Sequence, residues 1–218
     1  MKPIRGIIFD MDGVLIDTVG FWADAEREVF SALGVRVTTD LAAITSGMTT
    51  AEVTDFWFER FPWDSPSKPA VEEKVISAVA RRIREEGRAI PGACEWVRAC
   101  GERGWKVGLA TNSPRCLIPE VLRRLNLEDK FDAVISAEEV ESGKPDPAIY
   151  RRALEKLGLG AEEAVVVEDS LTGAAAGVAA GCQTFLLGTD EPPIGDEKTD
   201  FFPISDFESL AAQVQLRK

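Results

Sequence analysis

Residues 4–17 have the sequence IRGIIFDMDGVLID. The apolar run from Ile4 to Asp10 lacks the alternation of a half-exposed strand, which is typical of a strand buried on both faces of a parallel sheet. Asp10 and Asp12 stand at its end, and two residues apart on extended backbone their side chains point the same way. Gly13 permits a sharp turn and the close approach of a ligand. We therefore expect a carboxylate-lined crevice here, although such residues are common at any strand-to-loop junction.

Further short apolar runs predict additional parallel strands. They span residues 105–111, 131–136, 164–168 and 183–187. Helical patterns separate them, and a capping residue followed by proline indicates helix starts at Ser113-Pro114 and at Asp146-Pro147. Strands that alternate with helices form βαβ units. The predicted fold class is therefore α/β: a Rossmann-like, doubly wound parallel sheet covered on both faces.

The connection between the first two strands is too long for a simple crossover, because about 95 residues lie between them. The insert carries helical stripes of apolar residues, one of which consists of Val71, Val75, Val79 and Ile83. Residues 61–67, FPWDSPS, divide it into two halves. We expect an inserted all-helical cap subdomain at residues 19–88 and a Rossmann-like core formed by residues 1–18 and 89–218.

The composition limits the possible functions. The chain has 218 residues, enough for one well-buried core plus a small inserted subdomain. It has 25 basic and 37 acidic residues, and the net charge of −12 disfavours binding to nucleic acid or to anionic membranes. The absence of histidine excludes Ser-His-Asp and Cys-His machinery, HExxH zinc sites and imidazole bases. Any chemistry must come from carboxylates, lysine, hydroxyls, thiols or a bound metal.

The cysteines and the longest uncharged segment indicate a cytoplasmic protein. No CxxC pair occurs among the four cysteines and no signal peptide precedes them, so we expect free buried thiols in a reducing compartment. Residues 170–189 are uncharged and contain a GxxxGxxxG repeat. Because this run also holds serine, threonine and glutamine, it is typical of a small-faced helix packed on a sheet and followed by a buried strand, and not of a membrane span.

Polar residues also follow the second and third predicted strands. Thr111, Asn112 and Ser113 supply hydroxyl and backbone N–H groups at the start of a helix, which suits phosphate, although a plain helix cap would use the same residues. Lys144 lies between glycine and proline before a helix, where it is either directed into the crevice or solvated. Both segments fit a rim that binds an anion.

Paired acids follow the fourth predicted strand. Glu168 and Asp169 come directly after an apolar run, and carboxylates at a buried strand end are costly unless a cation or hydrogen-bond donors compensate them. With Asp10 and Asp12 they form an acidic cluster without histidine. Oxygen ligands of this kind suit Mg²⁺ and not zinc. We therefore expect these four residues to form a Mg²⁺ site.

Taken in order, these segments resemble the four sequence motifs of the haloacid dehalogenase-like superfamily. The motifs are DxDGxxxD at residues 10–17, Thr-Asn-Ser at 111–113, GKPDP at 143–147 and EDSxxG at 168–173. The insert is similar to the helical cap of the branch that contains phosphoglucomutases and phosphatases. The resemblance implies phosphoryl transfer with Mg²⁺. The presence of Asp12 argues against the dehalogenase branch, which does not use that acid.

The same resemblance implies a role for each motif residue. Asp10 would be the nucleophile that forms an aspartyl-phosphate, and Asp12 the general acid and base, kept protonated for its acid step by partial burial among carboxylates. Mg²⁺ would be held by Asp10, the Asp12 carbonyl and Asp169, with Glu168 bound directly or lying behind them. The residues implied to bind the phosphoryl group are Thr111, Asn112, Ser113 and Lys144.

Departures from the mutase pattern favour hydrolysis. Mutases of this type carry a hinge histidine twelve residues after the nucleophile, where this chain has Trp22, and a cap arginine where it has Thr49 and Thr50. The aromatic segment around Trp57 resembles the cap of bacterial hexitol and 2-deoxyglucose-6-phosphate phosphatases, although a small cap also needs aromatic residues for its own core. The substrate contacts expected in the cap are Trp22, Gly47 and Thr49.

We therefore expect a cytoplasmic, monomeric, Mg²⁺-dependent phosphomonoester hydrolase. Its partner is expected to be a small phosphorylated metabolite, a hexose or hexitol phosphate, and not a nucleic acid or a membrane. The alternatives are a β-phosphoglucomutase-like mutase, a phosphatase for phosphoglycolate or a nucleotide, and a catalytically silent binding module with the same fold. The complete motif set disfavours the binding module, and substrate panels separate the others.

Overall fold

The computed structural model describes residues 3–45, 47–189 and 200–215. In these ranges six strands form one parallel sheet in the order β3-β2-β1-β4-β5-β6. The strands are β1 (Gly6–Phe9), β2 (Lys106–Thr111), β3 (Ala133–Ser136), β4 (Ala164–Glu168), β5 (Gln183–Leu187) and β6 (Phe201–Ile204). This is the order of a doubly wound sheet, so the predicted fold class is confirmed.

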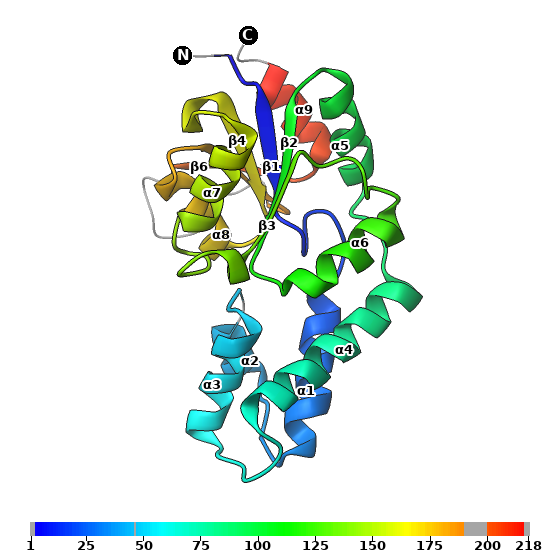
Figure 1. Cartoon of the computed structure of the whole chain (residues 1–218), viewed down its shortest axis with the longest axis vertical. Coiled ribbons are helices and arrows are strands. Elements are labelled where there is room, and N and C mark those ends of the chain that lie inside the picture. The colour runs from blue at the N-terminus through cyan, green and yellow to red at the C-terminus, as the bar shows by residue number, and fades with distance from the viewer. Residues whose placement is uncertain (1–2, 46, 190–199, 216–218) are drawn as a thin grey trace.

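Helices cover both faces of the sheet. They are α5 (Ala93–Glu102), α6 (Ile118–Leu125), α7 (Ala148–Leu157), α8 (Leu171–Ala179) and α9 (Phe207–Gln215). In β1, Ile7 and Phe9 belong to the core shared with α5, α6 and α9, whereas Ile8 belongs to the core under α7 and α8 (Figure 1). All three side chains are fully buried. Burial on both faces explains why this strand is a continuous apolar run.

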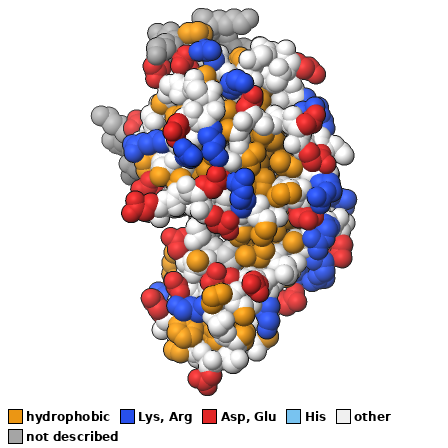
Figure 2. Space-filling view, viewed as in Figure 1, with side chains coloured by type: hydrophobic (Ala, Val, Ile, Leu, Met, Phe, Trp, Pro, Cys, Tyr) orange, Lys and Arg blue, Asp and Glu red, His pale blue; other side chains and the backbone are white. Residues whose placement is uncertain are grey.

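Further helices lie between β1 and α5 in the chain. They are α1 (Val19–Ala32), α2 (Thr39–Ile44), α3 (Thr50–Arg60) and α4 (Lys68–Glu86). Figure 1 shows them gathered at one end of the molecule, beyond the carboxyl ends of the strands, and Figure 2 shows the surface hollowed between the two parts. Helix α4 packs on α1, α3 and α6. Helices therefore occupy most of residues 19–88, while the division into a core and a cap subdomain stays a prediction.

An aromatic cluster forms the core of these inserted helices. Trp57 is fully buried, and its ring lies 5.2 Å from Phe56, 6.0 Å from Phe30 and 6.2 Å from Phe61, measured between centroids. Aromatic pairs at such distances contribute packing energy beyond the area that they bury. Trp57 is thus a core residue. This agrees with the expectation that a small helical cap needs aromatic residues for its own core.

The helix starts that the sequence predicted are displaced in the structure. A 3₁₀ turn at Arg115–Leu117 follows Pro114, and α6 begins only at Ile118, so the predicted start at Ser113-Pro114 is wrong. Helix α7 begins one residue after Pro147, and its Ala148 N–H donates to the Asp146 carboxylate at 2.8 Å. The displacement at Ser113 has a physical reason, because its hydroxyl is used elsewhere, as described below.

Strand β6 and one cysteine also differ from the predictions. The run at β6 is short and contains Pro203, a residue that sheets accept at edge strands, and it therefore gave no strand signal. The cysteines are free, as expected, but Cys116 is exposed and only Cys100 and Cys182 are buried. Within the described ranges, no helix has both the length and the apolar composition needed to cross a bilayer.

Helix α8 approaches the sheet closely through small residues. Gly173 and Gly177 are buried, and the helix packs on β4 and β5. A Cβ atom at Gly177 would lie 2.6 Å from Thr184 Oγ1 and 3.1 Å from Val166 Cγ1. The prediction of a small-faced helix followed by a buried strand at residues 170–189 is confirmed.

This close approach makes Gly177 sensitive to one added methyl group. We expect Gly177→Ala to lower the free energy of unfolding by about 1–3 kcal/mol through overpacking. Gly101 in α5 has nothing within 4 Å of its Cβ position, so Gly101→Ala is the matched control and is expected to be neutral or slightly stabilising. Urea denaturation of both variants measures the difference. Equal stability of the two would show that α8 can move away from the sheet without cost.

Candidate active site

The carboxyl ends of the central strands bring residues from distant parts of the chain together. Asp10 directly follows β1, Thr111 ends β2 and Glu168 ends β4, and all three are buried. Lys144 reaches the same place from the loop between β3 and α7 and is 7% exposed. The structure thus excludes the solvated alternative for Lys144 and places it in the crevice.

The Lys144 ammonium group is fully paired. Its Nζ atom donates to Asp10 Oδ1 at 2.5 Å and to the carbonyl oxygen of Ala110 at 2.9 Å, and it lies 2.6 Å from Glu168 Oε1. An ammonium group has three donors and no acceptor, so these three oxygens occupy all of its donors. Loss of Lys144 would leave both buried carboxylates without their shared cation, which is strongly destabilising.

The charges of this cluster do not balance. Burial acts to lower the pKa of Lys144, but Asp10 and Glu168 outweigh it, so that the pKa is raised and the lysine stays charged. Burial raises the pKa of Asp10 well above its usual range, because Lys144 offsets only part of the effect and Glu168, Asp169 and Asp12 add to it. More positive charge is needed here to keep Asp10 ionised.

An oxygen cluster beside this lysine can hold a divalent cation. Asp10, Glu168 and Asp169 each offer one oxygen atom, and these atoms lie within 4.8 Å of one another. Burial, with the neighbouring charge of Glu168, raises the pKa of Asp169 to about 7, although Lys144 acts in the opposite direction. Carboxylates that gather without enough compensating charge are the donor set that Mg²⁺ takes in proteins.

Two glycines leave the room that these acids need. A Cβ atom at Gly13 would lie 1.9 Å from Asp169 Oδ2, and Gly13 also has a φ of +72°. A Cβ atom at Gly173 would lie 2.1 Å from the carboxyl carbon of Glu168. No other residue fits either position without moving an acid of the cluster.

Glu168 has further partners that the sequence did not reveal. The Tyr150 hydroxyl donates to Glu168 Oε1, and the Ser170 hydroxyl donates to Oε2 at 3.5 Å. Burial and the charge of Glu168 raise the pKa of Tyr150 well above its usual range. One feature of the sequence could have indicated this role: Tyr150 is the single tyrosine of the chain and stands beside an apolar helical stripe. Glu168 therefore positions Lys144, and direct contact of Glu168 with a metal stays a prediction.

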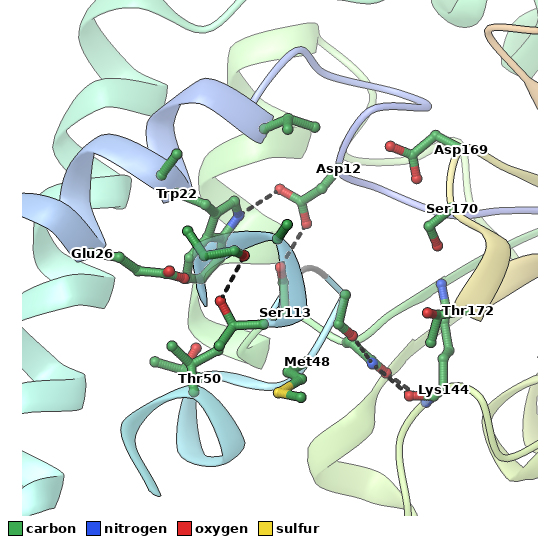
Figure 3. A pocket seen from close by; sticks show the side chains of 18 of the residues that line it. Asp12, Trp22, Glu26, Met48, Thr50, Ser113, Lys144, Asp169, Ser170 and Thr172 are labelled. Carbon is green, nitrogen blue, oxygen red and sulfur yellow. Dashed lines mark hydrogen bonds between the residues drawn. The ribbon is translucent and has the colours of Figure 1, made fainter. Parts of the chain in front are cut away.

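Asp12 is held by hydrogen-bond donors, not by carboxylates. Its Oδ1 atom accepts from the Thr18 hydroxyl at 2.5 Å and from the Trp22 indole N–H at 3.0 Å, and its Oδ2 atom accepts from the Ser113 hydroxyl at 2.6 Å. These contacts appear as dashed lines around Asp12 in Figure 3 for the residues drawn. Because its hydroxyl donates to Asp12, Ser113 does not cap a helix. Trp22 contacts Asp12 directly.

The Asn112 side chain ties two loops together. Its Nδ2 atom donates to the carbonyl oxygens of Gly47 at 2.9 Å and Lys144 at 3.2 Å, while its Oδ1 atom accepts from the Lys144 N–H at 2.9 Å. The Thr111 hydroxyl accepts from the Ser113 N–H at 3.0 Å. The predicted phosphate residues thus lie together, but Asn112 is already engaged in holding the Lys144 segment.

A cavity of about 460 Å³ extends from this cluster toward the inserted helices (Figure 3). Its sheet end is lined by Asp10, Asp12, Thr111, Asn112, Ser113, Lys144, Glu168, Asp169, Ser170 and Thr172. Its helical end is lined by Val19, Trp22, Ala23, Glu26, Arg27, Val37, Thr38, Thr39, Ala42, Ala43, Thr45, Gly47, Met48, Thr50 and Val53. The volume suits a small metabolite.

Two of the three cap residues predicted to contact substrate line this cavity. Trp22 and Gly47 do, whereas Thr49 forms a capping box with Glu52 at the start of α3. The cavity wall at this place is formed by Thr50 instead. Glu26, one helical turn after Trp22, also lines the cavity and was not predicted, because its position gave no motif signal.

Comparison with known proteins identifies the family. Residues 4–181 match the model of the haloacid dehalogenase-like hydrolases. The chain belongs to this family. The match includes all four motif segments and the inserted helices, so the resemblance seen in the sequence is confirmed, and the protein is an enzyme of the hydrolase type.

Individual relatives agree with this assignment. The chain is 37% identical over 191 residues to hexitol phosphatase B of Escherichia coli (strain K12), covering 87% of this chain and 86% of that protein. It is 35% identical over 184 residues to the phosphorylated carbohydrates phosphatase of Thermotoga maritima, covering 83% of each. The structure of β-phosphoglucomutase from Clostridium difficile superposes with a TM-score of 0.82 over 98% of both chains at 21% identity, which is a likeness of fold.

The partly buried carboxyl group of Glu26 leads to a prediction of how stability depends on pH. Burial raises the pKa of Glu26 to about 7 from 4.5. Between these values the folded chain holds a proton that the unfolded chain has lost, so the free energy of unfolding falls as the pH rises. Glu26→Gln removes this effect and is expected to be more stable than the unmodified protein at pH 8 by up to about 3 kcal/mol.

The measurement is urea denaturation of Glu26→Gln at pH 5 and pH 8. The gain at pH 8 should shrink toward zero at the lower pH. Asp24→Asn, an exposed neighbour on α1, is the matched control and should show no such trend. A stability difference that is the same at both pH values would contradict burial as the cause.

Proposed function

We propose that this enzyme is a Mg²⁺-dependent phosphomonoester hydrolase that acts on a small sugar phosphate, a hexose or hexitol phosphate, through an aspartyl-phosphate. The observation that carries the proposal is the buried Lys144–Asp10 pair at the base of a metabolite-sized cavity. A carboxylate fixed by an ammonium group, with Asp12 nearby, is a nucleophile beside a general acid. The names of the two bacterial phosphatases above support the substrate class.

The proposed reaction has two displacements. In the first, an Asp10 carboxylate oxygen bonds to phosphorus, the ester P–O bond breaks, and the leaving oxygen takes a proton from Asp12. In the second, water bonds to phosphorus and gives a proton to Asp12 while the bond between Asp10 and phosphorus breaks. Phosphate and the free alcohol leave, and both acids return to their starting states.

The contacts of Asp12 indicate which of its two carboxylate oxygens would carry the proton that is transferred in the proposed reaction. The Trp22 indole N–H can only donate, so Asp12 Oδ1 stays an acceptor. The Ser113 hydroxyl at Oδ2 can donate or accept, so it remains bonded whether or not this oxygen is protonated. The transferable proton is therefore assigned to Oδ2. Thr18 and Trp22 orient the group without taking part in the transfer.

The oxygen cluster supports the metal part of the proposal. Asp10, Asp169 and the backbone carbonyl of Asp12 would hold Mg²⁺, with Glu168 adjacent. A bound Mg²⁺ ion supplies positive charge that keeps carboxylates ionised and neutralises the phosphoryl oxygens. The raised pKa values of Asp10 and Asp169 in the protein alone fit a site that is completed by such a cation.

The remaining motif residues would bind the phosphoryl group. Lys144, Thr111 and Ser113 line the sheet end of the cavity, where Lys144 would contribute its positive charge and Thr111 the proton of its hydroxyl. Asn112 would contribute by holding the Lys144 segment in place. In the cap, Trp22 and Gly47 are the proposed substrate contacts, whereas Thr49 is engaged with Glu52 and does not line the cavity. Residues 19–88 would cover the core formed by residues 1–18 and 89–218. We propose a cytoplasmic monomer.

The first test is phosphate release from a panel of hexose, hexitol, pentose and nucleotide monophosphates and phosphoglycolate. We expect release from a hexose or hexitol phosphate that requires Mg²⁺, stops with EDTA, and falls by at least about 10³-fold in Asp10→Asn, since the nucleophile is lost. Exposed Asp129→Asn is the control and should match the unmodified protein. Activity that survives Asp10→Asn would refute the mechanism.

The same panel separates the alternatives. Preference for phosphoglycolate or a nucleotide would replace the proposed substrate while keeping the mechanism. Conversion of a β-hexose 1-phosphate to its 6-phosphate without phosphate release would assign a mutase. If the phosphorylated compounds bind without any turnover, the catalytically silent binding module would be the remaining alternative.

The contact between Trp22 and Asp12 yields a separate prediction. Trp22→Phe keeps an aromatic ring but removes the N–H donor, so we expect kcat to fall about tenfold for a sugar phosphate and for an aryl phosphate alike. Trp22→Ala should in addition raise KM for the sugar phosphate far more than for the aryl phosphate. Steady-state kinetics with both substrates measure the effects. If Trp22→Phe left both kcat values unchanged, the indole N–H would have no part in positioning Asp12.

A further inference from the structure

The helical end of the cavity contains an isolated carboxyl group. Glu26 projects from α1 into a wall that includes the apolar residues Val37, Ala42 and Val53 (Figure 3). Within the described ranges the Glu26 side chain forms no ion pair or hydrogen bond, and burial raises its pKa to about 7. Partial burial of a carboxyl group without a partner has a cost, which a hydrogen-bond donor on a ligand in the cavity would reduce.

A second unpaired polar group lies in the same wall. Thr50 is 9% exposed, and its Oγ1 atom is buried with no hydrogen-bond partner among the described residues. Two other threonines of the wall use their hydroxyls locally: Thr38 caps α2, and Thr45 donates to the carbonyl oxygen of Ala42 at 3.0 Å. Thr50 therefore differs from Thr38 and Thr45 in having an unused hydroxyl, which is buried in the wall of the cavity.

The position of Glu26 fits the length of a short carbon chain. Trp22 contacts Asp12, the proposed acid that meets the leaving oxygen. Glu26 follows Trp22 by four residues on α1, which is about 6 Å along the helix axis. A substrate whose phosphate lies at the sheet end thus extends its carbon chain past Trp22 toward Glu26.

We propose that Glu26 and Thr50 form a hydroxyl-recognition site that selects a polyhydroxylated carbon chain at the end of the substrate remote from the phosphate. This inference rests on the proposed phosphatase function and adds the residues that determine its specificity. Sugar hydroxyls donate to the Glu26 carboxyl group and accept from, or donate to, the Thr50 hydroxyl. A site with buried polar groups rejects analogues that leave those groups unpaired, so the pair selects against substrates without hydroxyls.

The test compares kcat/KM for a hexitol phosphate with kcat/KM for p-nitrophenyl phosphate, which has no hydroxyl groups at its far end. The ratio of the two values reports recognition, because phosphoryl transfer is common to both substrates. Glu26→Met keeps length without hydrogen bonding and should lower the ratio at least tenfold, and Thr50→Val should lower it about fivefold or more. Glu26→Gln, which still hydrogen-bonds, should retain more of the ratio than Glu26→Met.

Controls separate this inference from the proposed function. Glu28→Gln on the same helix, which does not line the cavity, should leave the ratio unchanged, and thermal denaturation establishes that each variant is folded. If the unmodified protein hydrolyses both substrates and the Glu26 and Thr50 variants lower both kcat/KM values equally, the recognition site is refuted while the phosphatase stands. If no phosphate ester is hydrolysed by the unmodified protein, the proposed function fails first.

One other ligand chemistry would suit a buried carboxyl group, namely an ammonium group. Glucosamine 6-phosphate added to the comparison distinguishes the two. Hydroxyl recognition predicts no preference for the amino sugar over glucose 6-phosphate. A tenfold preference for the amino sugar that disappears in Glu26→Met would overturn hydroxyl recognition in favour of a cation partner.

Discussion

The buried ammonium group of Lys144 is the interaction on which the rest of the site depends. It stands between Asp10 and Glu168, which come from neighbouring strands, and so it holds together two carboxylates that would otherwise repel each other at close range. One positive charge is not enough for the acids gathered there, and this excess negative charge makes the crevice suitable for a cation. The same arrangement places the Asp10 carboxylate, the proposed nucleophile, at the base of the cavity, where the residue is 6% exposed.

The surrounding fold supplies what that interaction requires. Parallel strands end at one edge, so their terminal residues meet although they are far apart in the chain. Glycines at positions 13 and 173 leave room for the acids. Tyr150 donates to the Glu168 oxygen that Lys144 also contacts, and Ser170 donates to the other one. The inserted helices then add a wall whose chemistry differs from that of the sheet edge. Its surface combines apolar side chains with Glu26, Arg27 and four threonines.

Much of this was predictable from the sequence, and the limits have physical causes. Strands β4 and β5 have the predicted bounds, because apolar runs between helical patterns have few other interpretations. The motif residues also meet as predicted, since strand ends must converge. Tyr150, Thr18 and Glu26 were missed because their roles depend on side chains distant in the sequence. Ser113 was misassigned to a helix cap because a hydroxyl can satisfy either a backbone N–H or, as here, the carboxylate of Asp12.

The Asn112 amide group has a consequence for how the enzyme takes up and releases ligands. One of its N–H bonds goes to the Gly47 carbonyl in the inserted segment, and its remaining contacts go to the backbone of Lys144. A displacement of Gly47 away from the sheet would free one amide proton of Asn112 at the rim of the cavity, while the contacts of Asn112 with Lys144 could persist. If phosphate binds there as proposed, this proton would be available to it only when the contact with Gly47 is broken, so that the cap and the anion would compete for the same donor.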